Sequence, residues 1–165
     1  MDTKRDIRDH EELKLRSVPV RISDKDLRAL AEKCGGSGIT IQELFETFVG
    51  DLTGGTFYSG SDESMYADQW YERHGFSWMY EDSLLSHLLR YGSADSVEDF
   101  LTAWDERAYY KDHPEEEVPE DQWWEDDLTD LLDGYKGEPT EDDIKTVREW
   151  LEEFQKLSDS SEEVG

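Results

Sequence analysis

The sequence predicts a mainly α-helical protein, with a short N-terminal β-strand and two helices followed by an acidic helical domain of about five helices. Apolar residues recur at helical spacing through most of the 165 residues. Four pairs of a Ser or Thr and an acidic residue three positions later are typical of helix N-termini. Aromatic residues, including six Trp, form 12% of the chain and supply core-forming surface although 36% of residues are charged.

The first elements are predicted in residues 14–53. Residues 14–22, KLRSVPVRI, alternate in polarity, which predicts a short strand with one buried face of Val18, Val20 and Ile22. Ser23 with Asp26 starts a helix that ends near Gly35, with an inner face of Leu27, Leu30, Ala31 and Cys34. Thr40 with Glu43 starts a second helix that ends at Gly54, with inner residues Ile41, Leu44, Phe45, Phe48, Val49 and Leu52.

Residues 17–23 (SVPVRIS), 26–35 (DLRALAEKCG) and 39–52 (ITIQELFETFVGDL) resemble the ribbon-helix-helix superfamily of the Arc and MetJ repressors and plasmid-encoded regulators. The resemblance covers about the first third of the chain. It implies a homodimer through the N-terminal strand, whose outward residues enter the major groove of DNA. By position these outward residues are Ser17, Pro19 and Arg21, and the candidate DNA-contacting residues are Arg16, Ser17 and Arg21.

Two departures from that pattern keep an alternative open. Pro19 cannot donate a ladder hydrogen bond, and Arg21 is the only cation on the face that would read bases. The alternative is a strand-helix-helix unit that serves only dimerisation or packing.

The remaining helices are expected in residues 61–157, after a Gly/Ser-rich linker at residues 54–60. Predicted helices span residues 61–74, 84–91, 96–111, 119–133 and 140–157. The third starts at a Ser96–Asp99 pair, the fourth has Pro119 in its first turn, and the fifth starts at a Thr140–Asp143 pair. Residues 1–13 and 158–165 are expected to be flexible ends.

Charge is distributed unevenly along the chain. Residues 1–50 carry a net charge of −1, whereas residues 51–165 carry −25. Within residues 112–143, fifteen carboxylates stand against one fixed cation, Lys136. Tryptophans and leucines recur through the same segment, so we expect its carboxylates to lie on a folded helix.

We therefore predict an acidic face that binds a partner, consisting of Glu115, Glu116, Glu117, Glu120, Asp121, Glu125, Asp126, Asp127 and Asp130. Tyr109, Tyr110 and Trp123 are candidate aromatic anchors beside it. Two alternatives stay open: a solvated polar face on ordinary amphipathic helices, or charge retained for solubility or salt tolerance.

Motifs for catalysis and metal binding are missing from the sequence. Cys34 is the only cysteine, and the four histidines have no metal-ligand spacing. The sequence has no phosphate-binding loop, nucleophile elbow or EF-hand pattern. We expect a non-enzymatic protein without metal or cofactor. No apolar run is long enough for a membrane span and no secretory signal is present, so a cytoplasmic location is expected.

In composition the acidic part resembles the small nucleic-acid mimics of mobile elements, such as anti-restriction and anti-CRISPR proteins. This resemblance implies an inhibitor that occupies the basic nucleic-acid-binding surface of a nuclease or effector complex. The alternative is a ribbon-helix-helix transcriptional or plasmid-maintenance regulator with an acidic partner domain. In that case direct DNA binding through the N-terminal strand replaces binding to a protein.

Overall fold

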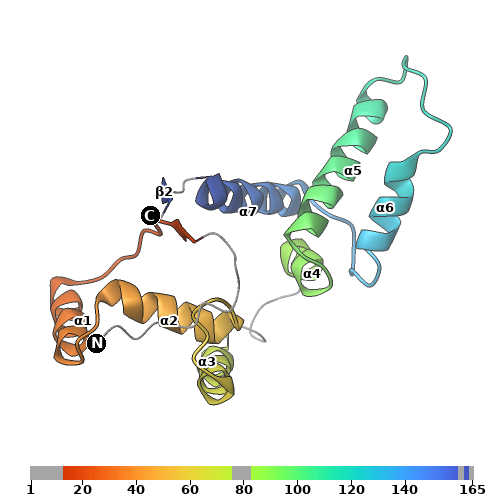
Figure 1. Cartoon of the computed structure of the whole chain (residues 1–165). Coiled ribbons are helices and arrows are strands. Elements are labelled where there is room, and N and C mark those ends of the chain that lie inside the picture. The colour runs from red at the N-terminus through yellow and green to blue at the C-terminus, as the bar shows by residue number, and fades with distance from the viewer. Residues whose placement is uncertain (1–12, 76–82, 160–161, 164–165) are drawn as a thin grey trace. The chain divides into compact units, whose positions relative to one another are not determined.

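The computed structural model describes residues 13–75, 83–159 and 162–163. These residues form seven helices and two short strands, which confirms a mainly α-helical protein (Figure 1). The chain divides into two compact units. Unit 1 comprises Met1–Tyr80 with Glu162–Gly165, and unit 2 comprises Glu81–Ser161.

Unit 1 contains helices α1 (Asp24–Gly36), α2 (Ile41–Thr53) and α3 (Ser61–Arg73). The predicted caps of α1 and α2 are confirmed. Ser23 Oγ accepts the Asp26 N–H at 3.1 Å, and Thr40 and Glu43 form a reciprocal capping box. Strand β1 (Lys14–Leu15) pairs antiparallel with β2 (Glu162–Glu163), and Lys14 lies opposite Glu163.

Helix α2 packs against α3 and against the turn that joins the two helices. The rings of Phe48 and Trp70 meet edge to face at 5.4 Å. The backbone N–H of Ser59 donates to Asp51 Oδ1 at 2.7 Å. A Cβ on Gly50 would lie 2.6 Å from the backbone carbon of Phe57, so only glycine permits this close approach.

Three predictions for unit 1 need correction. The strand expected over residues 14–22 is reduced to Lys14–Leu15, because in the described part of the chain its ladder partner is the two-residue strand Glu162–Glu163. The expected buried faces are largely exposed: Val18 by 64%, Val20 by 68% and Ile22 by 45% on the strand segment, Leu27 by 45% on α1, and Phe45 by 51%, Phe48 by 36% and Val49 by 54% on α2. Cys34 is buried as expected.

The third correction concerns the domain boundary. It was expected at residues 54–60, but the unit 1 division includes α3 and ends at residue 80. The reason is the packing of α3 and its preceding turn onto α2 through Trp70 and Ser59. Residues 54–60 are therefore an ordered turn within unit 1.

Unit 2 contains α4 (Leu84–Arg90), α5 (Ala94–Asp112), α6 (Trp123–Leu131) and α7 (Glu141–Asp159). Helix α5 packs against α4, α6 and α7. Their inner faces form one apolar core of Leu84, Leu88, Val97, Phe100, Leu101, Ala103, Trp124, Leu128, Ile144 and Val147. Arg148 of α7 also forms an ion pair with Asp105 of α5.

Two helix starts in unit 2 differ from the prediction. Helix α5 begins at Ala94 because Ser93 is its N-cap and donates its backbone N–H to Ser96 Oγ at 3.1 Å. Helix α6 begins at Trp123, four residues after Pro119, because Gln122 adopts a left-handed backbone with φ of 33°. The predicted cap of α7 is confirmed by reciprocal bonds between Thr140 and Asp143.

The expected flexible ends are only partly within the described residues. Residues 1–12, 160–161 and 164–165 lie outside them. Helix α7 continues to Asp159, and residues 162–163 form β2, so part of the expected C-terminal tail has regular structure.

Candidate acidic interface on the α5–α6 hairpin

Helix α6 has one apolar and one acidic side. Trp124 and Leu128 are 2% and 3% exposed, because they pack against α5 in the core. Tyr110 of α5 stacks on Trp124 with ring centroids 5.1 Å apart and an interplanar angle of 11°. The core therefore determines which side of α6 faces the solvent.

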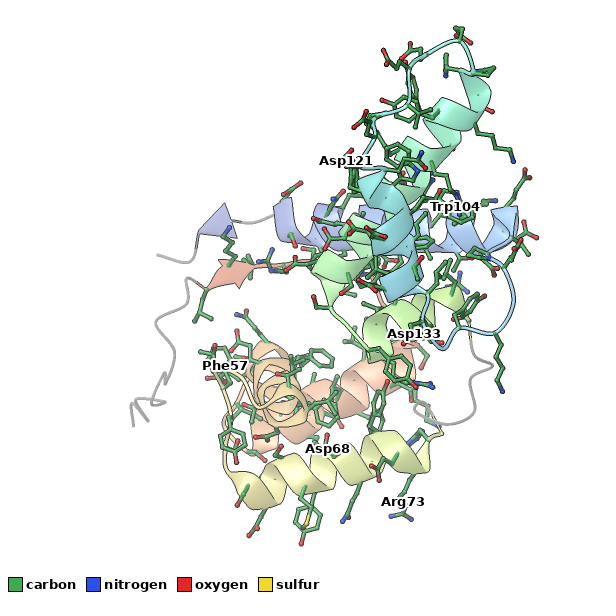
Figure 2. All side chains as sticks on the ribbon, turned by 90° about the vertical axis from the view of Figure 1, so that its right-hand side faces the viewer. Phe57, Asp68, Arg73, Trp104, Asp121 and Asp133 are labelled. Atoms are coloured by element: carbon green, nitrogen blue, oxygen red, sulfur yellow. The ribbon has the colours of Figure 1, made fainter. Side chains whose placement is uncertain are left out.

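All nine predicted residues of the acidic face are exposed. Four of them lie on α6: Glu125, Asp126, Asp127 and Asp130. The other five lie in the loop that joins α5 to α6: Glu115, Glu116, Glu117, Glu120 and Asp121. Figure 2 shows Asp121 near the beginning of α6 and Asp133 just beyond its end. The acidic face thus follows α6 and the loop before it.

The loop is held by hydrogen bonds that begin at the end of α5. Tyr109 donates its hydroxyl to Glu116 Oε1 at 2.7 Å, and the His113 ring contacts the Tyr109 carbonyl oxygen through Nδ1 at 2.9 Å. The Glu116 backbone N–H donates to the His113 carbonyl oxygen at 3.0 Å. These bonds tie the carboxylate of Glu116 to α5.

The Tyr109–Glu116 bond also affects proton affinity. Donation to the carboxylate raises the pKa of Tyr109 above its usual 10.0, with a further contribution from desolvation. The neutral hydroxyl is the form that can donate, so the bond is present at neutral pH.

The three candidate anchors differ in exposure. Tyr109 is 41% exposed and stacks on His113 with centroids 4.3 Å apart, whereas Trp123 is 37% exposed and meets Trp124 edge to face. Tyr110 is partly buried against the core. Tyr109 and Trp123 therefore remain candidates for partner contact, while Tyr110 mainly supports Trp124.

The candidate DNA-contacting residues lie in unit 1. Arg16, Ser17 and Arg21 are exposed in the segment between β1 and α1, which has no regular structure. The structure brings these residues onto one short segment, but only Lys14 and Leu15 next to them form a strand. The ribbon arrangement stays a prediction.

Metal-binding clusters and membrane-spanning helices are both missing from the described ranges. No group of three or more His, Cys, Asp or Glu side chains in these residues has an arrangement suited to a metal ion. None of the helices there combines the length and the apolar character needed to cross a membrane. Cys34 is a buried free thiol in unit 1.

Sequence reasoning missed one feature of unit 2. A hollow of about 360 Å³ lies where the ends of α4 and α6 meet the start of α5, lined among others by His87, Tyr91, Ser96, Asp130 and Asp133. His87 Nε2 lies 3.1 Å from the Leu131 carbonyl oxygen, 44 residues away in the chain. A buried histidine in a leucine-rich helix was the only signal, because the partner carbonyl is distant in sequence.

Comparisons with known proteins identify no relative. A scan against protein-family models and searches of curated proteins and of solved structures found no match for the chain.

Proposed function

We propose that this protein is a non-enzymatic acidic binding protein whose α5–α6 hairpin occupies the basic nucleic-acid-binding surface of a partner. The observation that supports the proposal is the two-sided character of α6. Trp124 and Leu128 are fixed in the core, and the carboxylates opposite them are exposed. The negative charges are thus held in position before a partner arrives, which lowers the ordering cost of binding.

The charge density on α6 matches that of a nucleic-acid strand. Nine residues of helix extend about 13 Å, at about 1.5 Å per residue. Over this length α6 displays four carboxylates: Glu125, Asp126, Asp127 and Asp130. One strand of B-DNA carries about one phosphate per 3.4 Å, or about four over the same distance. The number of charges per unit length on α6 is therefore similar to that of a DNA strand, with Asp126 and Asp130 on the side opposite the core and Glu125 and Asp127 on its two flanks.

The surrounding charge favours rapid association with such a groove. Unit 2 has a net charge of −19 in 81 residues. A field of this sign attracts a basic surface over about a Debye length and raises the association rate at low salt. Tyr109 and Trp123 lie beside the carboxylates as exposed rings that can form the apolar centre of the contact.

The first experiment is competition with DNA. A partner recovered by co-purification from the host, and identified by mass spectrometry, is tested for duplex binding with and without the purified protein. The proposal predicts that the protein displaces DNA and that its affinity falls steeply between 0.1 and 0.5 M salt, on the order of the loss seen for DNA itself. A partner that binds the protein and the duplex together would contradict it.

A charge-neutralising variant with a matched control tests the location of the interface. Replacing Glu125, Asp126 and Asp127 of α6 by their amides should weaken partner binding at least about tenfold, mostly through slower association. Replacing Glu149, Glu152 and Glu153 of α7 by Gln removes the same charge elsewhere on unit 2. Equal losses in the two variants would mean that only net charge matters.

A second candidate is a ribbon-helix-helix regulator that binds DNA as a homodimer through its N-terminal strand. It is favoured by the two capped helices α1 and α2 and by the exposed apolar side chains of Val18, Val20 and Ile22, which a second strand could cover. In this case Arg21→Ala in the full chain abolishes operator binding in a mobility-shift assay. The acidic-interface proposal predicts that neither the unmodified protein nor the Arg21→Ala variant binds the duplex.

A further inference from the structure

The hollow of about 360 Å³ at the C-terminal end of α6 is lined by carboxylates, an aromatic ring and a hydroxyl group. Asp130 on the last turn of α6 and Asp133 just after it line the hollow, and both are exposed. Tyr91 at the end of α4 and Ser96 on the first turn of α5 line it as well. A volume of this size is within the range of about 300–1,000 Å³ typical of small-ligand pockets.

We propose that this hollow binds the guanidinium group of an arginine side chain. The inference rests on the proposed function, since it takes the arginine to belong to the basic partner that the α5–α6 hairpin engages. It adds a specific anchoring pocket to a surface otherwise defined by charge alone.

The balance of charge in the hollow favours a cation. Asp130 and Asp133 contribute two full negative charges, and the C-terminal end of α6 adds about half a negative charge. The first turn of α5 opposes them with about half a positive charge. At each of these two helix ends one backbone group is already paired, the Ser96 N–H with the Ser93 carbonyl oxygen at 3.0 Å and the Leu131 carbonyl oxygen with His87 Nε2 at 3.1 Å. Two carboxylates outweigh one helix terminus.

The ring of Tyr91 favours a guanidinium group over an ammonium group in the hollow. Tyr91 is 77% exposed, and its ring centroid lies 5.2 Å from that of His87. A planar guanidinium can stack on such a ring while donating paired hydrogen bonds to a carboxylate, whereas a lysine ammonium acts as a point charge. An exposed ring beside two carboxylates is therefore suited to arginine.

His87 positions the two sides of the hollow. It is 7% exposed, and its Nε2 lies 3.1 Å from the Leu131 carbonyl oxygen at the end of α6. Its ring also lies 5.4 Å from that of Tyr135. These contacts attach α4 to the end of α6, so the backbones that carry Tyr91 and the two aspartates are held together before any ligand enters.

Two cations lie close enough to weaken the site. Arg90 and Lys136 line a smaller hollow of about 70 Å³ that shares His87, Tyr91 and Gly134 with the larger one. Lys136 is exposed, so its removal should not disturb the core. The proposal accordingly requires that Lys136→Ala strengthens arginine binding.

The experiment is an NMR titration of the full-length protein with N-acetyl-L-arginine amide, which carries the guanidinium of a protein side chain without free termini. Saturable shifts of the Tyr91, His87 and Asp133 resonances are expected. Asp130→Asn with Asp133→Asn should weaken binding at least about tenfold, and Tyr91→Leu about threefold to tenfold. The control, Asp126→Asn with Asp127→Asn, removes the same charge from α6 outside the hollow and should change binding less than about twofold.

Three outcomes would overturn the inference. The first is an equal effect of the two double variants, which would mean diffuse attraction. The second is equal binding of N-acetyl-L-lysine amide, which would exclude guanidinium recognition. The third is tighter binding of free L-arginine than of the amide, which would make the site one for a small molecule instead of a partner's side chain.

The same variants separate this inference from the proposed function. If Asp130→Asn with Asp133→Asn abolishes binding of the arginine amide but leaves partner affinity unchanged, the arginine does not come from the partner and the inference fails while the function stands. If the amide binds the hollow but the protein displaces DNA from no partner, the proposed function fails while the inference about the hollow stands. A loss of both affinities in this variant supports both.

Discussion

The two units of this protein differ in how they bury apolar surface. In unit 2, ten buried apolar residues from four helices form one core around Phe100, which is 0% exposed. In the described part of unit 1, Cys34 and Ala67 are the only buried apolar side chains, and Phe45 and Val49 are more than half exposed. The amphipathic pattern is present in both units, but among the described residues it is the helices of unit 2 that cover one another's apolar faces.

The difference matters because unit 2 also carries most of the charge. Its net charge of −19 compares with −7 for unit 1. Self-repulsion of this size disfavours a compact state, so the negative unit needs the larger core. Unit 1 depends more on caps, turns and close backbone packing, such as the approach of Gly50 to Phe57.

The largest expected effect comes from opening the core of unit 2. Trp124→Ala removes a ring that is 2% exposed and stacks on Tyr110, and should lower the free energy of unfolding by about 3–5 kcal/mol. Urea unfolding at fixed ionic strength measures this loss. Phe45→Ala in unit 1 is the matched control, because its ring is 51% exposed and its removal should cost under about 1 kcal/mol. Equal losses would contradict the comparison.

The next effect is on backbone packing in unit 1. Gly50→Ala places a Cβ 2.6 Å from the Phe57 backbone and should destabilise the protein by about 1–3 kcal/mol. Gly36→Ala on α1 meets no atom within 4 Å and should be neutral or stabilising by up to about 1 kcal/mol. Thermal unfolding followed by circular dichroism distinguishes the two. A neutral Gly50→Ala would mean that the turn after α2 adjusts freely.

A smaller effect is expected at the start of α7. Thr140→Ala removes the hydroxyl that accepts the Asp143 N–H at 3.2 Å, which should cost about 1 kcal/mol. Thr146→Ala on the same helix is the control, since its hydroxyl bonds back to the Asp142 carbonyl oxygen and caps no helix end. Chemical denaturation should show a lower midpoint for the first variant alone.

The smallest effect is the pH response of the loop before α6. The pKa of Tyr109 is raised above 10.0 by its bond to Glu116, so the bond contributes below about pH 10 and is lost as pH rises through the folded-state pKa. The Tyr109 ring resonance in 13C NMR, assigned by its absence from Tyr109→Phe, should titrate above pH 10, separately from Tyr135, whose pKa is also raised by desolvation. Glu116→Gln should shift this titration toward pH 10, and an unchanged midpoint would exclude the bond in solution.

Helix starts were the part of the fold most accessible to sequence reasoning. Ser23, Thr40 and Thr140 cap the helices as predicted because the bonds involved span only three residues. Ser96 was assigned the wrong role, since the N-cap is Ser93 and Ser96 Oγ accepts its backbone N–H, in a pair that lacks the acidic residue of the other caps. Pro119 suggested an early start for α6, but the left-handed Gln122 delays it to Trp123.

The candidate site also has features that the sequence predicted and features that it did not. The exposure of Asp126 followed from helical spacing opposite Trp124 and Leu128, and that of Glu125 and Asp127 from positions that flank the apolar side. The bond from Tyr109 to Glu116 and the hollow beside His87 could not be predicted in this way. Each depends on where a loop or a second helix lies relative to the first.

The sequence by itself determined that the chain is mainly helical, where several helices begin, and that negative charge accumulates after residue 50. Such properties depend on residue type and short-range spacing. Only the tertiary structure decided which amphipathic faces are covered. Phe100 and Trp124 are buried because helices distant in sequence meet over them, whereas Phe45 and Val18 have similar patterns and remain exposed. A side chain is buried only where another element packs over it, and the local sequence does not specify which element does so.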